Sequence, residues 1–285
     1  MPSDFPQRQP SAQPAGAPGG EGAPVRILCV GDVVGRPGRR VLRELLPELR
    51  RRHQLDFIVV NGENAAGGFG VVPQTLQELL DEDVDVITSG NHIWDKKEAI
   101  SLLEQSERLL RPLNFPEGVP GRGWGIYATA AGQPVGVINA QGRVFMTAIE
   151  CPFRQVEAVL PLIQARAKII LVDFHAEATS EKVAFGRFLD GRVTAVFGTH
   201  THVQTADEQI LPRKTAYITD LGMTGPHESV IGMDIKASIQ RFLTQLPGKF
   251  EPENKGLRLN GLLLEADPET GQALRVERLN LPLGG

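Results

Sequence analysis

Cysteine and long apolar runs are both scarce in this chain of 285 residues. Its two cysteines, Cys29 and Cys151, are too few for a disulfide framework and are typical of a reducing compartment. No apolar stretch approaches the roughly 18 residues that a membrane-spanning helix requires. The sequence therefore argues against a disulfide-stabilised scaffold and a membrane partner, and we expect a cytoplasmic protein.

Net positive charge is absent as well. Thirty lysines and arginines face 34 aspartates and glutamates, which gives a formal net charge of -4. A chain with this balance has no general attraction for nucleic acid or for an anionic membrane surface, so strong nucleic-acid binding is not expected. A small anionic ligand would need a local positive centre.

Apolar patterning is missing from the first 24 residues, which are rich in Pro, Gln, Ala and Gly. They contain no apolar core of a signal peptide, so we expect residues 1–24 to form a disordered tail. With 41% apolar residues, the chain can bury a substantial core. We expect residues 25–285 to form a single domain.

From residue 25 onward, short apolar runs alternate with segments of helical period, a pattern typical of an α/β fold. The expected strands are 25–30, 57–60, 84–88, 125–127, 135–138, 169–174, 193–197, 216–219, 256–265 and 273–281. The expected helices are 37–49, 73–80, 96–103, 153–165, 180–189 and 235–246. Pro47 is expected to bend or restart the first helix. The proline- and glycine-rich stretch 111–148 suggests a hinge or an inserted antiparallel β segment.

Polar residues directly follow five of the expected strands. The five clusters are Gly31-Asp32, Asn61-Gly62-Glu63-Asn64, Ser89-Gly90-Asn91-His92, His175 and Gly198-Thr199-His200-Thr201-His202. In open α/β sheets, ligands bind at the carboxyl edge of the strands, where the loops converge. We therefore expect the five clusters to form one shared site.

The residue types in these clusters indicate metal chemistry. The candidate metal ligands are Asp32, Glu63, Asn64, Asn91, His175, His200 and His202. They are more than one tetrahedral ion could use, whereas two ions bridged by a carboxylate would use them all. Two-metal sites hold their ions about 3.5 to 4 Å apart and stabilise the in-line displacement of a phosphoryl group. Imidazoles combined with carboxylate and amide oxygens suit iron, manganese or zinc better than magnesium or calcium.

These clusters, in this order, resemble the five motifs of the calcineurin-like metallophosphoesterases. Two positions depart from the general pattern of that superfamily. Asp32-Val33-Val34 lacks the histidine of the usual Asp-x-His, and Gly62-Glu63-Asn64 replaces the usual Gly-Asp, so that the Asn64 amide oxygen could fill the vacancy. Together with the stretches 31–39, 61–68 and 220–226, these departures resemble the bacterial YmdB-like branch. The similarity covers roughly residues 25 to 282.

The resemblance implies a four-layer α/β/β/α sandwich, a di-iron or di-manganese centre, a homo-oligomer and phosphodiesterase activity on cyclic nucleotides, including 2',3'-cyclic nucleotides. It also implies two sets of metal ligands that share Glu63. One set is Asp32, Glu63, Asn64 and His202, and the other is Glu63, Asn91, His175 and His200. His92 is implied as the proton donor.

Two further residues are candidates for binding the substrate phosphate, and each has a simpler interpretation. Arg36 could be part of a solvated helix face, and His227 could serve only in loop packing. Two alternative functions also stay open. One is a protein or nucleic-acid phosphatase or nuclease that uses the same site. The other is a non-catalytic regulatory or RNA-binding protein with a vestigial site.

Overall fold

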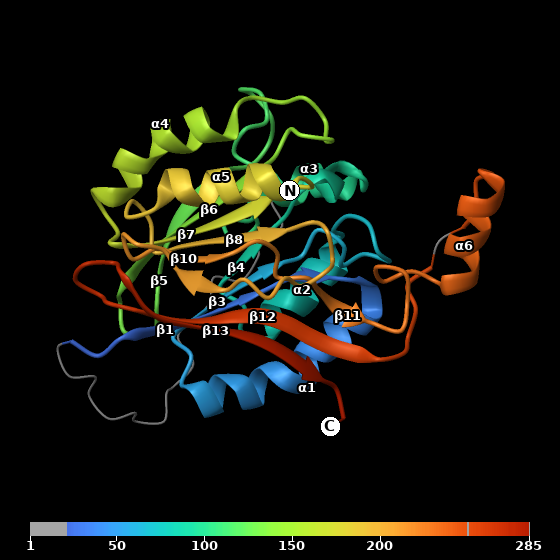
Figure 1. The fold of residues 1–285 in the computed structure, drawn as a ribbon, viewed down its shortest axis with the longest axis horizontal. Helices are drawn as coiled ribbons and strands as arrows, with labels where there is room; N and C mark the ends of the chain where they lie inside the picture. Colours follow the sequence, from blue (N-terminus) through green and yellow to red (C-terminus); the bar gives the residue numbers. More distant parts are fainter. Residues whose placement is uncertain (1–21, 250, 285) are drawn as a thin grey trace, which may run out of the picture.

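The computed structural model describes residues 22–249 and 251–284 (Figure 1). Most of the expected disordered tail, residues 1–21, lies outside the described residues. The helices are α1 (Gly35–His53), α2 (Pro73–Asp81), the 3-10 helix η1 (Asn91–Trp94), α3 (Glu98–Gln105), α4 (Pro152–Gln164), α5 (Thr179–Leu189) and α6 (Ile235–Thr244). The strands are β1 (Val25–Val30), β2 (Asp32–Val33), β3 (Phe57–Asn61), β4 (Val86–Thr88), β5 (Trp124–Ala128), β6 (Pro134–Gln141), β7 (Ile169–His175), β8 (Ala195–Thr199), β9 (Gln209–Ile210), β10 (Ala216–Ile218), β11 (Met223–Pro226), β12 (Leu257–Ala266) and β13 (Ala273–Pro282).

The strands form two mixed sheets. The first has the order β2-β11-β12-β1-β3-β4, with β13 paired to β12, and the second has the order β5-β6-β7-β8-β10-β9. Within the first sheet β1, β3 and β4 run parallel, and within the second β6, β7, β8 and β10 run parallel. Each sheet therefore has an edge at which several carboxyl ends of strands lie side by side.

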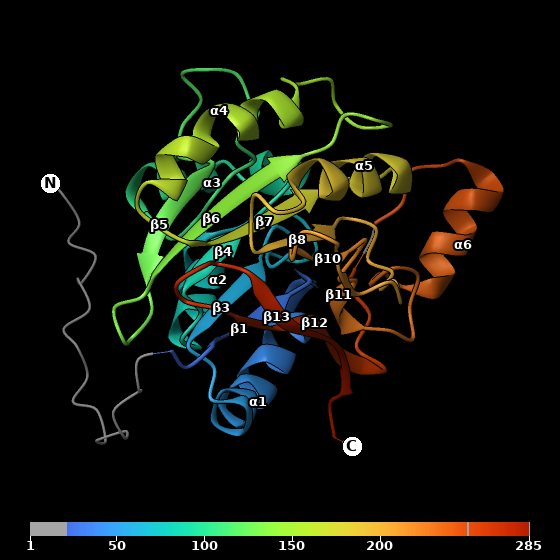
Figure 2. The same cartoon turned by 60° about the vertical axis from the view of Figure 1, so that its left-hand side comes forward.

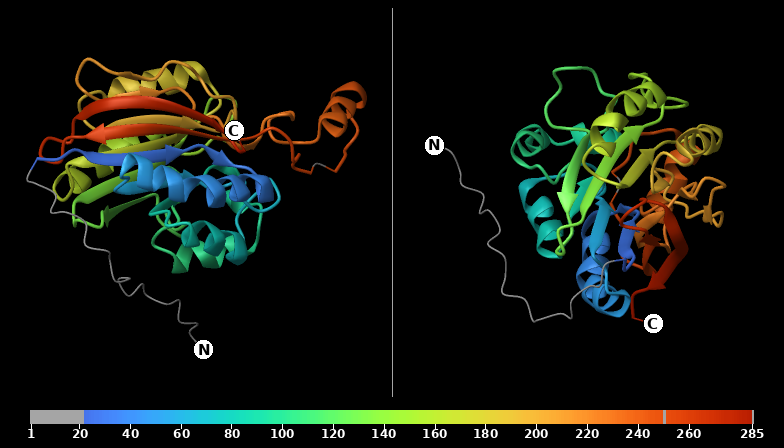
Figure 3. Two further views of the ribbon diagram at one scale, coloured as in Figure 1. Left: turned by 90° about the horizontal axis from the view of Figure 1, so that it is seen from below. Right: turned by 90° about the vertical axis from the view of Figure 1, so that its left-hand side faces the viewer.

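Alternating side chains divide the core into three apolar layers. On β1, Ile27 and Cys29 pack between the two sheets, whereas Leu28 and Val30 pack on the opposite face with residues of α1, α2 and α3. Ile170 and Val172 of β7 point to the outer face of the second sheet, where α4 and α5 cover them. Helices therefore cover the outer faces of two packed sheets (Figure 3), and the expected four-layer α/β/β/α sandwich is confirmed.

Every expected helix and strand has a counterpart in the structure. The strands expected near 125 and 135 are antiparallel, but they are part of the second sheet and not an insertion, because β5 is its edge strand and β6 also pairs with β7. The helix does not restart at Pro47, since α1 runs through it unbroken. Proline has no backbone N–H, so one carbonyl in the preceding turn lacks its helical hydrogen bond, and water can bond to it because Pro47 is exposed. The buried Leu46 and Leu49 on either side hold the helix against the core.

The segment 227–256 leaves the sandwich between β11 and β12 and carries α6. This helix stands away from the body of the molecule (Figures 1 and 2), and Ser238 is its one buried residue. Its first turn is capped by Asp234, whose carboxylate accepts a hydrogen bond from the backbone N–H of Ala237. Among the described residues, no helix combines the length and the apolar character needed to cross a membrane.

Candidate metal centre

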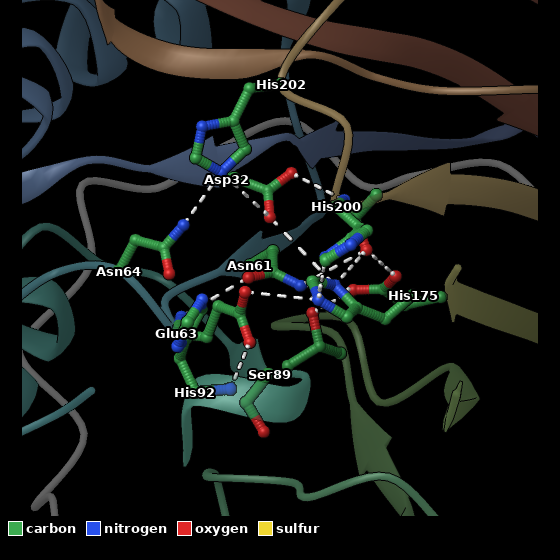
Figure 4. Close-up of polar contacts among 12 residues, drawn as sticks. Asp32, Asn61, Glu63, Asn64, Ser89, His92, His175, His200 and His202 are labelled. Atoms are coloured by element: carbon green, nitrogen blue, oxygen red, sulfur yellow. Dashed lines mark hydrogen bonds and ion pairs between the residues drawn. The ribbon is translucent and has the colours of Figure 1, made fainter. Parts of the chain in front are cut away.

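The seven predicted metal ligands meet at the carboxyl edges of both sheets, and Figure 4 labels all of them except Asn91. Asp32 lies just after β1, Glu63 and Asn64 follow β3, Asn91 begins η1 after β4, His175 ends β7, and His200 and His202 follow β8. The first and second sheets thus each contribute part of the cluster. The prediction of one shared site for the five motifs agrees with this arrangement.

His175 is the centre of one group of donors. Its Nε2 lies 3.1 Å from Glu63 Oε1, 3.1 Å from Asn91 Oδ1 and 3.1 Å from His200 Nδ1. Glu63, His175 and His200 offer ligand atoms that all lie within 4.8 Å of one another. This spacing suits a single ion with nitrogen and oxygen ligands.

His202 is the centre of the second group. Its Nε2 lies 2.7 Å from Asn64 Nδ2 and 3.9 Å from Asp32 Oδ1. The same Asp32 oxygen lies 3.9 Å from His175 Nδ1, so the two groups are adjacent. The partition of these residues into two ligand sets, which the sequence resemblance implies, stays a prediction.

Two buried oxygens of the site have no hydrogen-bond partner among the described residues, namely Asp32 Oδ1 and Asn64 Oδ1. A buried polar atom without a partner costs free energy, and most such atoms in proteins are satisfied by protein, water or an ion. Both orphaned atoms belong to residues predicted to bind one ion with His202. The residues present therefore fit a metal centre.

The ligands strongly perturb one another's ionisation. Burial on its own would raise the pKa of Glu63, but His175 and His92 outweigh it and lower the pKa to about 2. Burial opposes protonation of His175, yet Glu63 and Asp32 raise its pKa to about 9. Burial and the neighbouring His175 lower the pKa of His200 to about 3. A histidine must be neutral to bind a metal, so binding of an ion through Nε2 of His175 would require this residue to lose one proton.

Close packing explains two glycines of the motifs. A Cβ atom at Gly90 would come within 2.1 Å of the His175 ring, and one at Gly198 would come within 1.8 Å of the Thr219 carbonyl oxygen. Any larger residue at Gly90 would push against a predicted ligand. The absence of a side chain at Gly90 thus allows the first sheet to approach His175 of the second, and that at Gly198 allows β8 to lie close to the end of β10.

Asp173 was not among the residues predicted from the sequence. It orients His175 indirectly, through the hydroxyl of Thr199. The Thr199 hydroxyl donates to Asp173 Oδ1 at 2.7 Å and must therefore accept from His175 Nδ1, 2.9 Å away. This arrangement directs the Nδ1 proton toward Thr199 and leaves Nε2 facing the other donors. Burial raises the pKa of Asp173 to about 6. A charged residue within an otherwise apolar strand was the available signal.

A buried ion pair holds the loop that carries the last two histidines. Lys182 Nζ donates to the Thr199 carbonyl at 2.8 Å and to the carboxylate of Asp220, which also accepts from the Thr201 backbone N–H. His200 and His202 both have positive φ, at 99° and 64°. Such backbone is unfavourable for these residues and needs support from its surroundings.

His92 lies at the rim of this cluster and beside a cavity of about 430 Å³. Its backbone N–H donates to Glu63 Oε2 at 3.0 Å, and its Nδ1 lies 2.8 Å from Asp95 Oδ2. The ring meets Phe69 edge-on, with centroids 5.0 Å apart. The side chain is therefore positioned independently of the backbone contact to Glu63.

Arg36 and His227 do not line this cavity. Arg36 is exposed at the start of α1. His227 is partly buried, with Nδ1 3.2 Å from the Gly225 carbonyl and Nε2 3.1 Å from Asn260 Nδ2. These contacts agree with loop packing, and binding of substrate by either residue stays a prediction.

Comparisons with known proteins place the chain in a family. The sequence model of the YmdB-like proteins matches residues 28–279. A 2',3'-cyclic-nucleotide 2'-phosphodiesterase of Bacillus subtilis (strain 168) is 46% identical over 255 residues, covering 90% of this chain and 96% of that protein. Two crystal structures are similar, each with a TM-score of 0.85. One is a hypothetical protein from Thermus thermophilus, 40% identical, with coverage of 90% of this chain and 99% of that one.

The other is a novel phosphatase from Mycoplasma pneumoniae, 33% identical, with coverage of 91% of this chain and 94% of that one. In each of these matches, nearly the whole length of both chains takes part. The chain therefore belongs to the family of YmdB-like proteins.

Proposed function

We propose that this protein is a dinuclear-metal phosphodiesterase that hydrolyses cyclic nucleotides, including 2',3'-cyclic nucleotides. The chain is a phosphoesterase, as its similarity to a phosphodiesterase and to a phosphatase indicates. The observation that supports the finer proposal is the clustering of the seven predicted ligands, two of which, Asp32 and Asn64, each have a buried side-chain oxygen without a hydrogen-bond partner among the described residues. The substrate class is taken from the activity named for the Bacillus subtilis relative.

Two sets of residues would hold the ions. Asp32, Glu63, Asn64 and His202 form one set, and Glu63, Asn91, His175 and His200 form the other, with Glu63 shared. When bound, two iron or manganese ions, with zinc as the alternative, supply Lewis-acid neutralisation of the phosphoryl charge and activate water for attack. The chain's own part is to hold these donors in place through Asp173, Thr199, Lys182 and Asp220.

His92 is proposed to protonate the departing ribose oxygen, which is a poor leaving group as an alkoxide. A carboxylate can only accept, so the contact with Asp95 places a proton on Nδ1. Nε2 is engaged by no hydrogen bond within the described residues, so in the imidazolium form, with a proton on each nitrogen, His92 would donate the Nε2 proton to the departing oxygen and become neutral. Histidine commonly serves as a general acid because its charge changes near neutral pH.

Two measurements on freshly purified protein test this function. Elemental analysis should find about two transition-metal ions per chain, as in other two-metal hydrolases. Hydrolysis should be faster with 2',3'-cyclic nucleotides and bis-p-nitrophenyl phosphate than with a phosphate monoester or RNA. Preference for the monoester would favour a phosphatase, and preference for RNA a nuclease. Metal binding without turnover of any of these would favour a regulatory protein.

A homo-oligomeric state and a cytoplasmic location remain predictions of the sequence. Both are accessible to direct measurement, the first by light scattering of the purified protein and the second by cell fractionation.

A further inference from the structure

The cavity beside the metal donors has a second wall of a different character. Its polar side is formed by predicted ligands and by His92. The rest of the lining contains five apolar side chains, Phe69, Val230, Ile231, Met233 and Phe242, together with Ser238 and Arg241 of α6. A volume of about 430 Å³ lies within the range of pockets that hold small organic ligands. The cavity is therefore built for a ligand with one anionic end and one apolar end.

The apolar wall is tied to the polar one at two points. Phe69 contacts the ring of the proposed proton donor His92. The Ile231 carbonyl oxygen lies 2.8 Å from Nδ1 of His202. Because a carbonyl oxygen can only accept a hydrogen bond, Nδ1–H is the donor. The segment 227–256 is thus hydrogen-bonded to a predicted metal ligand, and α6 is held next to the reacting end of the cavity.

Phe242 is the part of this wall with most surface left to cover. Its side chain is 76% exposed although it lines the cavity, and Ile231 is 53% exposed. Stacking of an exposed aromatic ring on another flat ring is energetically favourable, and exposed aromatic side chains commonly stack on nucleobases. Its neighbour on α6, Leu243, is also 76% exposed and does not line the cavity.

We propose that α6 and the loop before it bind the nucleobase of the substrate, with Phe242 as the stacking surface. The inference rests on the proposed function, because it requires a cyclic nucleotide whose phosphate lies at the metal donors. A cyclic nucleotide has the chemistry that the cavity requires, since it joins an anionic phosphate to a flat base through one ribose. Selection of nucleotides over other phosphodiesters is then a property of the segment 227–256, separate from the metal donors.

The test compares two substrates that differ only in the base. Adenosine 2',3'-cyclic phosphate carries it, and methyl β-D-ribofuranoside 2',3'-cyclic phosphate has a methoxy group in its place. The measured quantity is the ratio of kcat/KM for the two. In the metal-loaded wild type the base-bearing substrate should be preferred. Phe242→Ala should lower the ratio about fivefold to tenfold, mainly through KM for the nucleotide.

Three further variants separate stacking from other effects. Phe242→Tyr keeps a ring and should retain the wild-type ratio, whereas Phe242→Leu keeps only apolar bulk and should resemble Phe242→Ala. Leu243→Ala, with equal exposure on the same helix, should retain the ratio. An unchanged ratio in Phe242→Ala, or an equal loss in Leu243→Ala, would overturn this inference while the proposed function stands. If wild-type protein cleaved neither cyclic phosphate, the proposed function itself would fall.

Discussion

The metal donors and the α6 segment form two walls of one cavity, but they are built in opposite ways. Asp32 and His175 are fully buried at strand ends of the sandwich, whereas Phe242 is 76% exposed on a helix that stands away from it. The donors need positions fixed within fractions of an ångström, and packed strands provide such rigidity. The difference suggests a division of labour, in which the buried strand ends fix the predicted ligands while the exposed segment 227–256 is proposed to select the substrate.

The rigidity of the donor wall comes from a contact between the sheets. Asp173 of the second sheet accepts hydrogen bonds from Asn61 at 3.0 Å and from Thr88, both in the first sheet, and from Thr199 beside it. One buried carboxylate thus joins the strands that carry Glu63, Asn91 and His175. Moving any of these donors would break buried hydrogen bonds to Asp173. This is costly because water cannot reach the freed groups to replace those bonds.

The largest effect on metal binding should come from removing the carboxylate of Glu63, which both proposed ligand sets share. In Glu63→Gln the side chain keeps its size but loses the charge that pairs with His175. We expect both ions to be lost and hydrolysis to fall to the background rate, because both proposed ligand sets include Glu63. Elemental analysis and turnover of bis-p-nitrophenyl phosphate measure the two effects. A variant that retained its metal content would show that Glu63 is not shared.

The next largest effect should come from His92, at the border between the two walls. His92→Ala should lower kcat about 10²- to 10⁴-fold through loss of general-acid catalysis. Both metals should remain, because the contact of this residue with Glu63 is made by its backbone N–H, which alanine retains. Metal content and single-turnover rates check this. Loss of metal with normal residual turnover would contradict the proposed role.

A smaller loss of metal affinity is expected for residues that hydrogen-bond to a predicted metal ligand without binding metal themselves. Thr199→Val removes the hydroxyl that accepts the His175 Nδ1 proton and donates to Asp173. We expect metal affinity to fall roughly 10- to 100-fold, as is typical when the partner of a ligating histidine is lost. Competition with a chelator measures this affinity, and Thr199→Ser should restore it. Equal loss in the serine variant would indicate a packing effect of the missing methyl group.

The same contrast governs what could be predicted from the sequence. The strands around Asp32, Glu63 and His175 are short apolar runs that end in polar residues, and their shared edge follows from general rules for α/β sheets. A strand that is buried on both faces appears in the sequence as a continuous apolar run, which is easy to recognise. The strands β2 and β9 have two residues each and form no such run.

Phe69 and Phe242 could not have been identified as neighbours of the site in this way. The periodicity predicts that 235–246 is a helix, but no local pattern says against what it lies. Its place beside the site depends on contacts such as the one between Ile231 and His202, 29 residues apart. The role of Asp173 could not be predicted either, because its partners Asn61 and Thr88 lie on strands distant in the sequence.

The smallest expected effect belongs to the exposed face of α6, and it measures how far this helix is independent of the sandwich. Leu243→Ala should change the free energy of unfolding by no more than about 0.5 kcal/mol, because this leucine is 76% exposed. The same truncation at Leu262, fully buried between the sheets, should cost about 2 to 5 kcal/mol. Urea unfolding of both variants provides the comparison. A large loss in Leu243→Ala would mean that another surface covers α6 in solution, since a side chain open to water has no packing to lose.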